Sequence, residues 1–361
     1  MTAPTSDFRP GLEGVVAFET EIAEPDKDGG SLRYRGIDIE DLVGRYPFEN
    51  VWGLLVDEDI NSPLPFPEPI ELQDPSGAVP SDLQAGLASL GPKWGLQKLV
   101  DIDAGQARDD LARLSAATLS IVAQAARGKQ TPVPDSEVKK GENAAAQFLI
   151  RWRGEADPRH VKAIDTYWIS AAEHGLNAST FTARIATSTG ADCAAVMSSA
   201  VGTLSGPLHG GAPARVLPMI DGAAQHGDPE AYIREMLDRG ERIMGFGHRV
   251  YRAYDPRATV LKRTAIELSS PRVEVAAALE EAALKVLREK SPDRQLETNV
   301  EYWAAVVLDV AEIPADLTPA MFGCARVAGW SAHILGQKRT GRLIRPSARY
   351  IGPGARTLEE L

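Results

Sequence analysis

The chain contains few cysteines and no long apolar run. Among its 361 residues are two cysteines, Cys193 and Cys324, and each stands alone in a stretch with helical spacing. We expect neither a disulfide framework nor a CxxC metal site, and both residues are predicted to be small buried hydrophobic side chains. No stretch approaches the ~18 uncharged apolar residues that a membrane span needs, and the N-terminus lacks the basic and apolar regions of a signal peptide. We therefore expect a cytoplasmic protein that does not associate with membranes.

Positive charge is also scarce in the chain as a whole. The formal net charge is -11 at pH 7. Such a field repels phosphate groups, so we expect no nucleic-acid partner. Basic residues nevertheless gather in two stretches, 243–258 and 337–349, which contain a single acidic residue between them. A bound anion would be held at these local clusters, unless they are only solvated faces.

Several common catalytic motifs are absent as well. The sequence has no GxxxxGK(S/T), GxSxG or HExxH pattern, and no GxGxxG pattern stands between a strand and a helix. Nucleotide hydrolysis, serine hydrolysis and zinc proteolysis therefore have no support in the sequence.

Helical spacing dominates what is present. Hydrophobic residues make up 43% and charged residues 25% of the chain, as in ordinary globular proteins, and the length favours about two domains. Asp-Pro pairs at positions 157, 228 and 255 are typical helix starts, because aspartate caps a helix and proline suits its first position. Residues 191–206 are rich in Ala, Ser and Gly and predict a helix in close contact with its neighbours. An Asp-Gly-Gly turn near the N-terminus predicts a small β-hairpin in an otherwise mainly α fold.

Three of the six histidines stand beside glycine at predicted element boundaries: His174, His209 and His248. An adjacent glycine lets the backbone and a ligand approach closely, which favours a functional role over a purely structural one. Their wide spacing, without any HxH or HxxxH pattern, argues against a metal site. Neutral imidazoles at these positions could instead donate hydrogen bonds to carbonyl oxygens on which negative charge develops.

Such a set of donors would need partners for carboxylates and a base. Arg257, Arg326 and Arg345 are candidates for binding carboxylates through two-pronged hydrogen bonds, which lysine cannot reproduce. A carboxylate is the expected base for taking a proton from carbon, and Glu297 and Glu301 stand at the start of a predicted apolar helix. Taken alone, these two acids are better explained as stabilising the helix N-terminus.

Four parts of the sequence are, in chain order, EHGLNASTFTAR, GPLHGGA, GFGHRVYRAYDPRA, and ARVAGWSAHILGQ followed by RLIRPSARYIGP. In their order and spacing these stretches resemble the citrate synthase family. Residues 57–160 match the family poorly, whereas the N-terminal hairpin and the following helix resemble its opening. The resemblance implies a nearly all-α homodimer in which a small domain, 212–311, closes over substrate on a large domain, 1–211 plus 312–361.

The resemblance also implies a reaction and a set of site residues. The reaction is the acyl transfer of the tricarboxylic acid cycle that condenses acetyl-CoA with oxaloacetate to give citrate and CoA, and it needs no cofactor because the thioester is a substrate. His209 resembles the histidine that hydrogen-bonds the thioester carbonyl, His248 the one that polarises the ketone, and Glu301 stands at the position of the base. The implied ligands of oxaloacetate or citrate are His174, Arg257, Arg326 and Arg345, the last donated across the dimer, and the implied CoA contacts are Gly245, Gly247, Arg252 and Lys262.

This chain departs from the family's pattern at the base. Where the family usually has PNVD the chain has TNVE, so Thr298 replaces a proline and Glu301 replaces the catalytic aspartate. Glutamate is slightly more basic, with a pKa of about 4.3 against about 3.9, but a misplacement of ~1 Å can slow a reaction ~100-fold. Pro213 also stands where the family generally has asparagine, which removes a side-chain hydrogen bond near His209.

Two alternative functions stay open at this point. A pocket for propionyl-CoA differs by one methyl group, worth only ~1 to 3 kcal/mol, so the sequence does not separate a citrate synthase from a 2-methylcitrate synthase. A catalytically impaired sensor of the same fold, which binds citrate or CoA, would keep the carboxylate-binding arginines and alter the base. The retention of all three histidines and all three arginines favours an enzyme.

Overall fold

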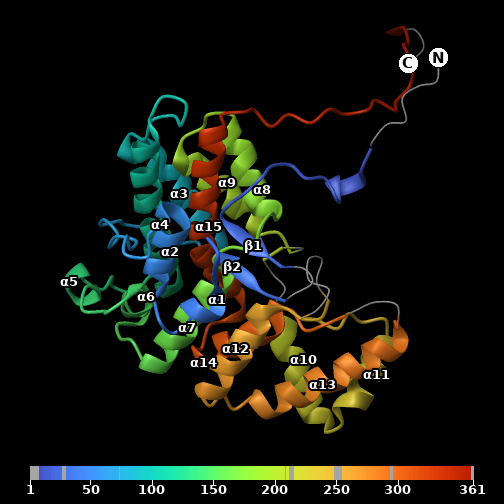
Figure 1. Cartoon of the computed structure of the whole chain (residues 1–361). Helices are drawn as coiled ribbons and strands as arrows, with labels where there is room; N and C mark the ends of the chain where they lie inside the picture. Colours follow the sequence, from blue (N-terminus) through green and yellow to red (C-terminus); the bar gives the residue numbers. More distant parts are fainter. Residues whose placement is uncertain are drawn as a thin grey trace.

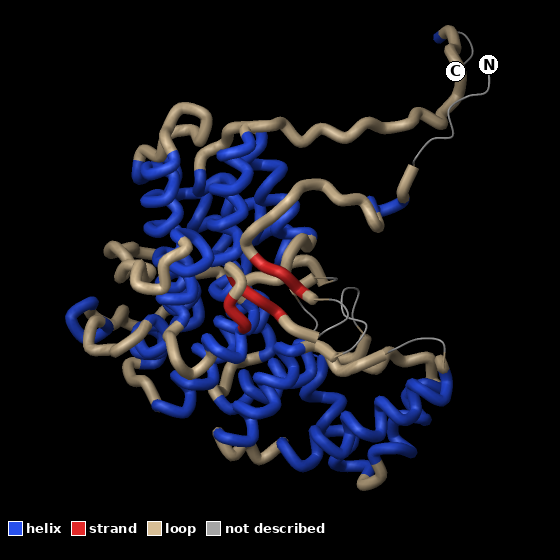
Figure 2. Tube along the Cα trace, viewed as in Figure 1, coloured by secondary structure: helices blue, strands red, loops and turns tan. Residues whose placement is uncertain are grey.

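The structure is a computed structural model in which most of the chain is described. The described residues are 8–26, 30–72, 74–207, 209–210, 215–247, 254–292 and 296–358. Helices make up most of this part of the chain, with one small sheet (Figure 2), which confirms the predicted mainly α fold.

The helices follow one another with short connections, and several begin where the sequence predicts. Asp157, Asp228 and Asp255 each cap the helix that follows by accepting a backbone N–H in its first turn. Two short 3-10 helices, Pro10–Leu12 and Ala315–Leu317, complete the helical elements of the described ranges. The α-helices are α1 (Ile39–Leu42), α2 (Phe48–Asp57), α3 (Val79–Trp94), α4 (Ala104–Arg127), α5 (Asp135–Val138), α6 (Ala144–Arg153), α7 (Pro158–Ala171), α8 (Ala178–Ser188), α9 (Cys193–Leu204), α10 (Val216–His226), α11 (Pro229–Asp238), α12 (Pro256–Glu267), α13 (Val273–Lys290), α14 (Val300–Val310) and α15 (Thr318–Thr340).

The predicted β-hairpin is present and gains a third strand. β1 (Ala23–Pro25) and β2 (Leu32–Tyr34) are antiparallel, and β3 (Ile37–Asp38) pairs with β2 on its other side. The Tyr34 side chain at the end of β2 is fully buried, and its hydroxyl donates to the carbonyl oxygen of Ile169 at 2.9 Å. The sheet is thereby fixed against the last turn of α7.

Helix α15 forms the centre of the larger group of helices (Figure 1). It packs against α2, α4, α7 and α8, and α9 packs in turn against α3 and α8. The small residues of α9 permit this close packing, as the sequence predicts. Cys193 on α9 and Cys324 on α15 are free thiols and buried, which confirms their predicted role as small core residues.

A second group, α10 to α14, lies below the first in Figure 1. Within it α11 packs against α13 and α12 packs against α14. Helix α7 contacts α12 and α14 as well as α15, so it joins the two groups. The division into a large domain, 1–211 plus 312–361, and a small domain, 212–311, stays a prediction.

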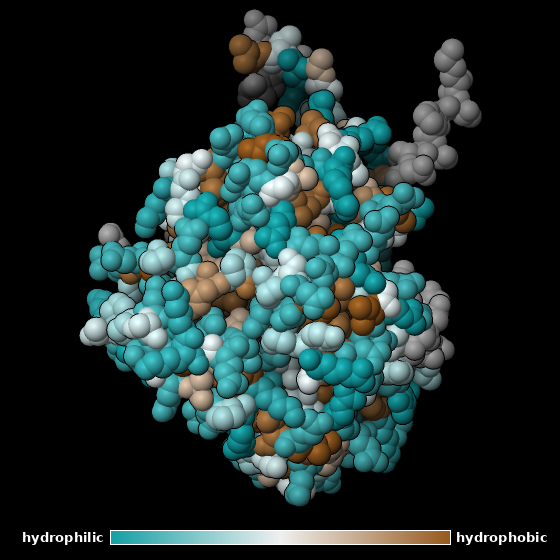
Figure 3. Space-filling view, turned by 60° about the vertical axis from the view of Figure 1, so that its left-hand side comes forward, coloured by the Kyte–Doolittle hydropathy of each residue, from teal (hydrophilic) through white to brown (hydrophobic). Residues whose placement is uncertain are grey.

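Both ends of the chain extend away from the helices. After Gly341 the chain leaves α15 as an extended segment, and the N-terminal segment runs out on the same side (Figure 1). The outer face in Figure 3 is largely hydrophilic, with apolar residues in small separate groups. In the part of the chain that the structure describes, no helix combines the length and the apolar character that a membrane crossing requires.

Candidate active site

Arg326 stands in the buried helix α15, and two of its donors are not used by any residue that the structure describes. The residue is 3% exposed, and its Nε and Nη1 atoms have no hydrogen-bond partner among the described residues. Its guanidinium carbon lies 4.8 Å from the centre of the Phe322 ring, one turn earlier on the helix. Burial lowers the pKa of Arg326, while the charge of Glu173 raises it and that of Arg257 lowers it. Because an unpaired buried donor is costly, this corner of the molecule is suited to binding an anion.

Arg257 brings a second guanidinium into the neighbourhood of Arg326 from helix α12. Its Nε atom donates to Oδ1 of Asp255 at 2.9 Å and its Nη2 atom donates to Oδ2 at 2.8 Å, and both side chains are almost fully buried. Asp255 also caps α12, and its Oδ2 accepts the backbone N–H of Val300 at 3.0 Å. One carboxylate therefore fixes the Arg257 side chain and the start of α14 relative to each other.

Glu301 lies in the first turn of α14. Its backbone N–H donates to the side chain of Asn299, which caps the helix, whereas its carboxylate makes no hydrogen bond or ion pair with another described residue. The pKa of Glu301 is raised to about 7: burial is the largest cause, Arg257 opposes the rise, and Asp255 adds to it. A carboxylate that is half-ionised near neutral pH is suited to act as a general base.

Glu297, the other acid that the sequence offers as a base, stands before α14 rather than in it. Its carboxylate accepts a hydrogen bond from Arg288 at 3.0 Å, with both side chains partly exposed. Its backbone carbonyl oxygen accepts the N–H of Gly247 at 2.8 Å. These contacts give Glu297 a structural explanation and leave Glu301 as the better candidate.

His209 lies just beyond the end of α9. Its Nε2 atom is 2.9 Å from the hydroxyl of Ser179, which also accepts the indole N–H of Trp330 at 3.3 Å. Its ring meets the Phe322 ring edge-on, with 5.9 Å between the ring centres. Burial, together with the charge of Arg326, lowers the pKa of His209 to about 4. The imidazole is therefore neutral at pH 7, as a hydrogen-bond donor to a developing oxyanion should be.

The segment after α7 places His174 beside this group. His174 is buried, and it follows Glu173, whose charge acts on Arg326. Tyr167, in the last part of α7, is also buried and interacts electrostatically with both Arg326 and Glu301. The structure thus brings four of the predicted residues into one cluster, which we call the arginine cluster: His209, Glu301, Arg257 and Arg326.

Sequence reasoning misses three residues of this neighbourhood. Ser179 stands five residues after His174 in a stretch that the sequence singles out, and Asp255 is interpreted from sequence only as a helix cap. No spacing pairs Ser179 with His209, because their contact depends on the packing of α8 near the end of α9. Tyr167 carries no sequence signal beyond its place on a predicted helix.

The family model for the citrate synthase C-terminal domain matches residues 11–347 of this chain. The chain belongs to the citrate synthase family. It is 61% identical over 363 residues to "Putative citrate synthase 2" of Mycobacterium tuberculosis, covering 100% of this chain and 97% of that protein. It is 32% identical over 365 residues to a 2-methylcitrate synthase of Shewanella oneidensis, covering 96% and 95% of the two chains. The citrate synthase of Thermoplasma acidophilum, solved in a ternary complex with carboxymethyl coenzyme A and oxaloacetate, matches with a TM-score of 0.82 and 26% identity over 99% of this chain and 100% of that chain.

The two glycines that the citrate synthase resemblance assigns to CoA have a clear role within the chain itself. Gly245 and Gly247 adopt φ values of +85° and +82°, which favour glycine. A Cβ atom at Gly245 would lie 2.7 Å from Cβ of Tyr302 on α14, and the Gly245 carbonyl oxygen accepts the N–H of Asn299 at 2.9 Å. These glycines therefore hold the chain against the start of α14, and their contact with CoA stays a prediction.

The remaining residues that the citrate synthase resemblance implies are not tested by the geometry. Lys262 pairs with Glu280 at 2.7 Å and lies 5.1 Å from the centre of a Trp303 ring, so its ammonium is engaged within α12 to α14. Arg345 is exposed on the extended C-terminal segment, and no ion pair joins it to another described residue. His248, Arg252 and Pro213 lie outside the described residues. Their roles stay predictions.

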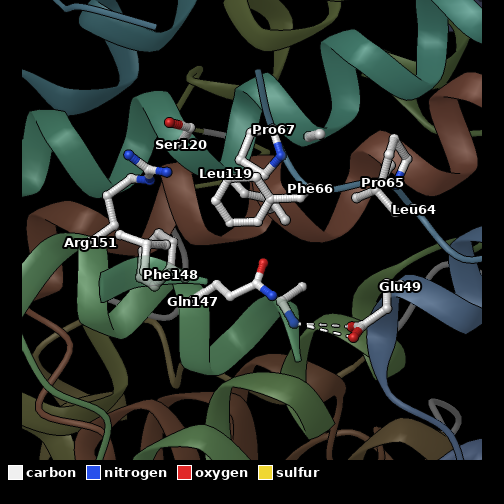
Figure 4. A pocket seen from close by; sticks show the side chains of 13 residues that line it. Glu49, Leu64, Pro65, Phe66, Pro67, Leu119, Ser120, Gln147, Phe148 and Arg151 are labelled. Atoms are coloured by element: carbon white, nitrogen blue, oxygen red, sulfur yellow. Dashed lines mark hydrogen bonds between the residues drawn. The ribbon is translucent and has the colours of Figure 1, made fainter. Parts of the chain in front are cut away.

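A separate small cavity lies away from the arginine cluster. It has a volume of about 70 Å³ and lies between the proline-rich segment 64–67 and helices α4 and α6 (Figure 4). Phe66 and Phe148 line it, and Glu49 at its edge accepts the backbone N–H of Ala144. None of the predicted site residues lines this cavity. Over the described ranges, no group of three or more His, Cys, Asp or Glu side chains is arranged to hold a metal ion.

Proposed function

We propose that this protein catalyses the condensation of acetyl-CoA with oxaloacetate to give citrate and CoA. The observation that carries the proposal is the arginine cluster, in which Arg257 interacts electrostatically both with Arg326, a buried guanidinium with two donors that no described residue accepts, and with Glu301, whose pKa burial raises to about 7. An anion-binding corner beside a poised base is the arrangement that a carbon-carbon bond-forming reaction on a dicarboxylate requires. The thioester is itself a substrate, so no cofactor is invoked.

Arg326 and Arg257 would bind the carboxylates of oxaloacetate. The Nε and Nη1 atoms of Arg326, which have no partner among the described residues, lie on different edges of the planar guanidinium, so each would donate to a different oxygen of the ligand. Arg257 is oriented by its two hydrogen bonds to Asp255 and would bring its positive charge to the ligand. His174, buried beside Glu173, would be a further ligand, and His248 would polarise the ketone.

Glu301 and His209 would act on the thioester. Glu301 would take a proton from the methyl group of acetyl-CoA, while His209 donates a hydrogen bond to the thioester oxygen from its Nδ1 atom. For that donation the neutral ring must carry its proton on Nδ1, so the single hydroxyl hydrogen of Ser179, which is donated to Oδ1 of Asn177 at 2.9 Å in this structure, would have to turn to Nε2 of His209, also 2.9 Å away. Ser179 would therefore set the tautomer of the catalytic histidine.

The enol carbon would then attack the ketone carbon of oxaloacetate. A new carbon-carbon bond forms, and the ketone oxygen takes a proton from His248 to give citryl-CoA. Water then hydrolyses the thioester and releases citrate and the free thiol of CoA. Preorganised donors of this kind are each worth ~10² to 10³ in rate.

The extended ends of the chain support a homodimer in which Arg345 reaches the other subunit's site. Apolar residues on these ends are strongly exposed, with Val16 at 84%, Tyr350 at 78% and Ile351 at 86%. Segments of this kind are costly in water and are typical of an interface. Arg345 lies on the same C-terminal segment, so a second copy would cover the segment and receive the arginine.

The test compares two acyl donors and three variants. Loss of the thioester is followed with acetyl-CoA and with propionyl-CoA, each with oxaloacetate, for the wild type, Glu301→Gln and Glu301→Asp. Glu297→Gln is the matched control, because Glu297 is a nearby acid that pairs with Arg288. We expect turnover with acetyl-CoA in the wild type and the control, and a loss of several decades in Glu301→Gln.

Other outcomes assign the protein differently. A clear preference for propionyl-CoA would make it a 2-methylcitrate synthase, the activity that its Shewanella relative is named for. Binding of citrate or CoA without turnover of either thioester would support a sensor of the same fold. Near-wild-type turnover in Glu301→Gln would exclude Glu301 as the base.

A further inference from the structure

A chain of buried polar side chains runs along the face of α15 that carries Arg326. Nε2 of His333 lies 3.1 Å from Oε1 of Glu173, and its Nδ1 lies 3.0 Å from Nε of Arg184. Arg184 also donates from Nη1 to the side-chain oxygen of Gln337 at 3.1 Å. His333 and Gln337 follow Arg326 by about two and three helical turns, so they lie on the same face of α15. The four linked residues are at most 4% exposed.

The hydrogen bonds that link Arg184, His333 and Glu173 have only one possible direction of donation. The Nε atom of Arg184 carries a hydrogen and can only donate, so Nδ1 of His333 must be the acceptor. The ring proton then sits on Nε2 and is donated to Glu173. Phe18 covers the chain from outside, with its ring centre 3.6 Å from the Arg184 guanidinium carbon and 5.8 Å from the His333 ring centre. The two hydrogen bonds from Arg184 to His333 and from His333 to Glu173 therefore both point towards the Glu173 carboxylate.

The Glu173 carboxylate is held from several sides. Its Oε2 atom packs against Gly329, where a Cβ atom would lie only 2.0 Å away. The backbone N–H of Glu173 donates to the Tyr34 hydroxyl at 3.3 Å, which fixes its backbone. Burial opposes ionisation, but the interactions with His333 and Arg326 and the backbone N–H of His174 outweigh it and lower the pKa of Glu173. Glu173 is therefore a charged, immobilised group.

Glu173 compensates the charge of Arg326 without using its donors. The two groups interact electrostatically, yet no hydrogen bond joins them, and Oε2 of Glu173 has no donor among the described residues. Nε and Nη1 of Arg326 stay unused. A direct ion pair between Glu173 and Arg326 would occupy the N–H groups that a ligand carboxylate needs.

We propose that His333 and Arg184 are positioning residues that hold Glu173 away from Arg326, so that the negative charge stabilises the buried guanidinium but does not compete with the substrate carboxylate. This inference rests on the proposed function, because it takes oxaloacetate as the ligand of Arg326. Once His333 is removed, Glu173 becomes an internal competitor for Arg326. The affinity for oxaloacetate then falls, whereas the affinity for the acyl-CoA does not.

The test measures oxaloacetate binding to the full-length protein by calorimetry without any acyl-CoA, and then the KM values for both substrates. His333→Phe and His333→Asn cannot bridge Arg184 and Glu173, and we expect each to weaken oxaloacetate binding by at least ~10-fold with KM for acetyl-CoA within ~2-fold of wild type. His333→Gln offers both an acceptor and a donor and should restore binding to within ~3-fold of wild type. Ser331→Ala is the matched control, because it removes a buried hydrogen bond to Ser115 on the same helix.

A second substitution distinguishes competition from a general structural defect. Glu173→Gln added to His333→Phe removes the competing charge, so we expect the double variant to bind oxaloacetate more tightly than His333→Phe alone. Wild-type affinity in both His333→Phe and His333→Asn would overturn the inference, and so would a double variant no better than the single one. If the wild type binds oxaloacetate but consumes no thioester, the proposed reaction fails while these affinities still decide the positioning role. If the wild type does not bind oxaloacetate, both fall.

Discussion

The raised pKa of Glu301 makes the pH dependence of turnover a direct test of its role as the base. Because burial raises this pKa to about 7, the ionised fraction should rise ~10-fold between pH 6 and pH 8. We expect kcat/KM to rise by the same factor, since a protonated carboxyl cannot take a proton from the thioester methyl group. His209, whose pKa burial lowers to about 4, stays neutral over this range and adds no slope.

Substitutions of Glu301 separate the charge of the base from its reach. Glu301→Gln keeps the size of the side chain and should lower kcat by ~10³-fold or more, with no rise between pH 6 and pH 8. Glu301→Asp draws the carboxylate back by one methylene group. The start of α14 cannot follow, because Asp255 holds the N–H of Val300 and Gly245 holds that of Asn299. We therefore expect Glu301→Asp to be ~100-fold slower than wild type.

The assay should follow the loss of thioester absorbance, which needs no pH-sensitive thiol reagent, at saturating oxaloacetate across the pH range. Glu297→Gln controls for the loss of a nearby acid. A kcat/KM that is flat between pH 6 and pH 8 in the wild type would refute the assignment of Glu301 as the titrating base. An equal rise in Glu301→Gln would refute it as well.

Three further predictions concern Ser179, Asp165 and Arg345. Ser179→Ala leaves the His209 tautomer unset and should lower kcat roughly 10- to 100-fold with little effect on KM for oxaloacetate, whereas an unchanged kcat would contradict the role of Ser179. Asp165→Asn keeps the acceptor for the Phe48 N–H and removes a carboxylate whose pKa burial raises to about 7. Because the unfolded pKa is 3.8, the wild-type carboxylate destabilises the folded protein increasingly as pH rises from 3.8 towards 7, so the gain in unfolding free energy from Asp165→Asn should be larger by ~2 kcal/mol at pH 8 than at pH 5. An equal gain at both pH values in thermal melts would argue against this role of Asp165. Co-expressed Arg345→Leu and Glu301→Gln subunits should regain up to ~25% of wild-type activity. Random pairing makes half of the dimers hybrids, and each hybrid has one intact site, formed by Glu301 of one subunit and Arg345 of the other. No regain on mixing would show that Arg345 acts within its own subunit.

The mainly α fold could be predicted because its signals are local. Asp157, Asp228 and Asp255 begin helices where Asp-Pro pairs stand, and the small residues of α9 predict its close packing. The third strand, β3, was not predicted, since two residues carry no periodicity. What the local signals cannot give is which helices pack together, such as the position of α7 between α15 and the pair α12 and α14.

The candidate site could be predicted only as a set of residue types. Arg326, His209 and Glu301 are visible in the sequence as an arginine, a histidine beside glycine and an acid at a helix start. Their electrostatic states are not, because the pKa of His209 is lowered and that of Glu301 raised by burial that depends on the packing of distant helices. The pairing of Asp255 with both Arg257 and Val300 is likewise a tertiary feature that a helix cap does not reveal.

The charges of the site are balanced before any ligand arrives. Asp255 neutralises Arg257 by direct hydrogen bonds, and Glu173 neutralises Arg326 at a distance, so the two guanidiniums leave little surplus positive charge for a dicarboxylate. Attraction by net charge, which would also draw phosphate and other anions, is therefore weak in this arrangement. The Nε and Nη1 hydrogens of Arg326, which no described residue accepts, point from different edges of the guanidinium, so a ligand must place two acceptor oxygens to meet both. Under the proposed function, donor geometry rather than surplus charge would give the site its selectivity for oxaloacetate.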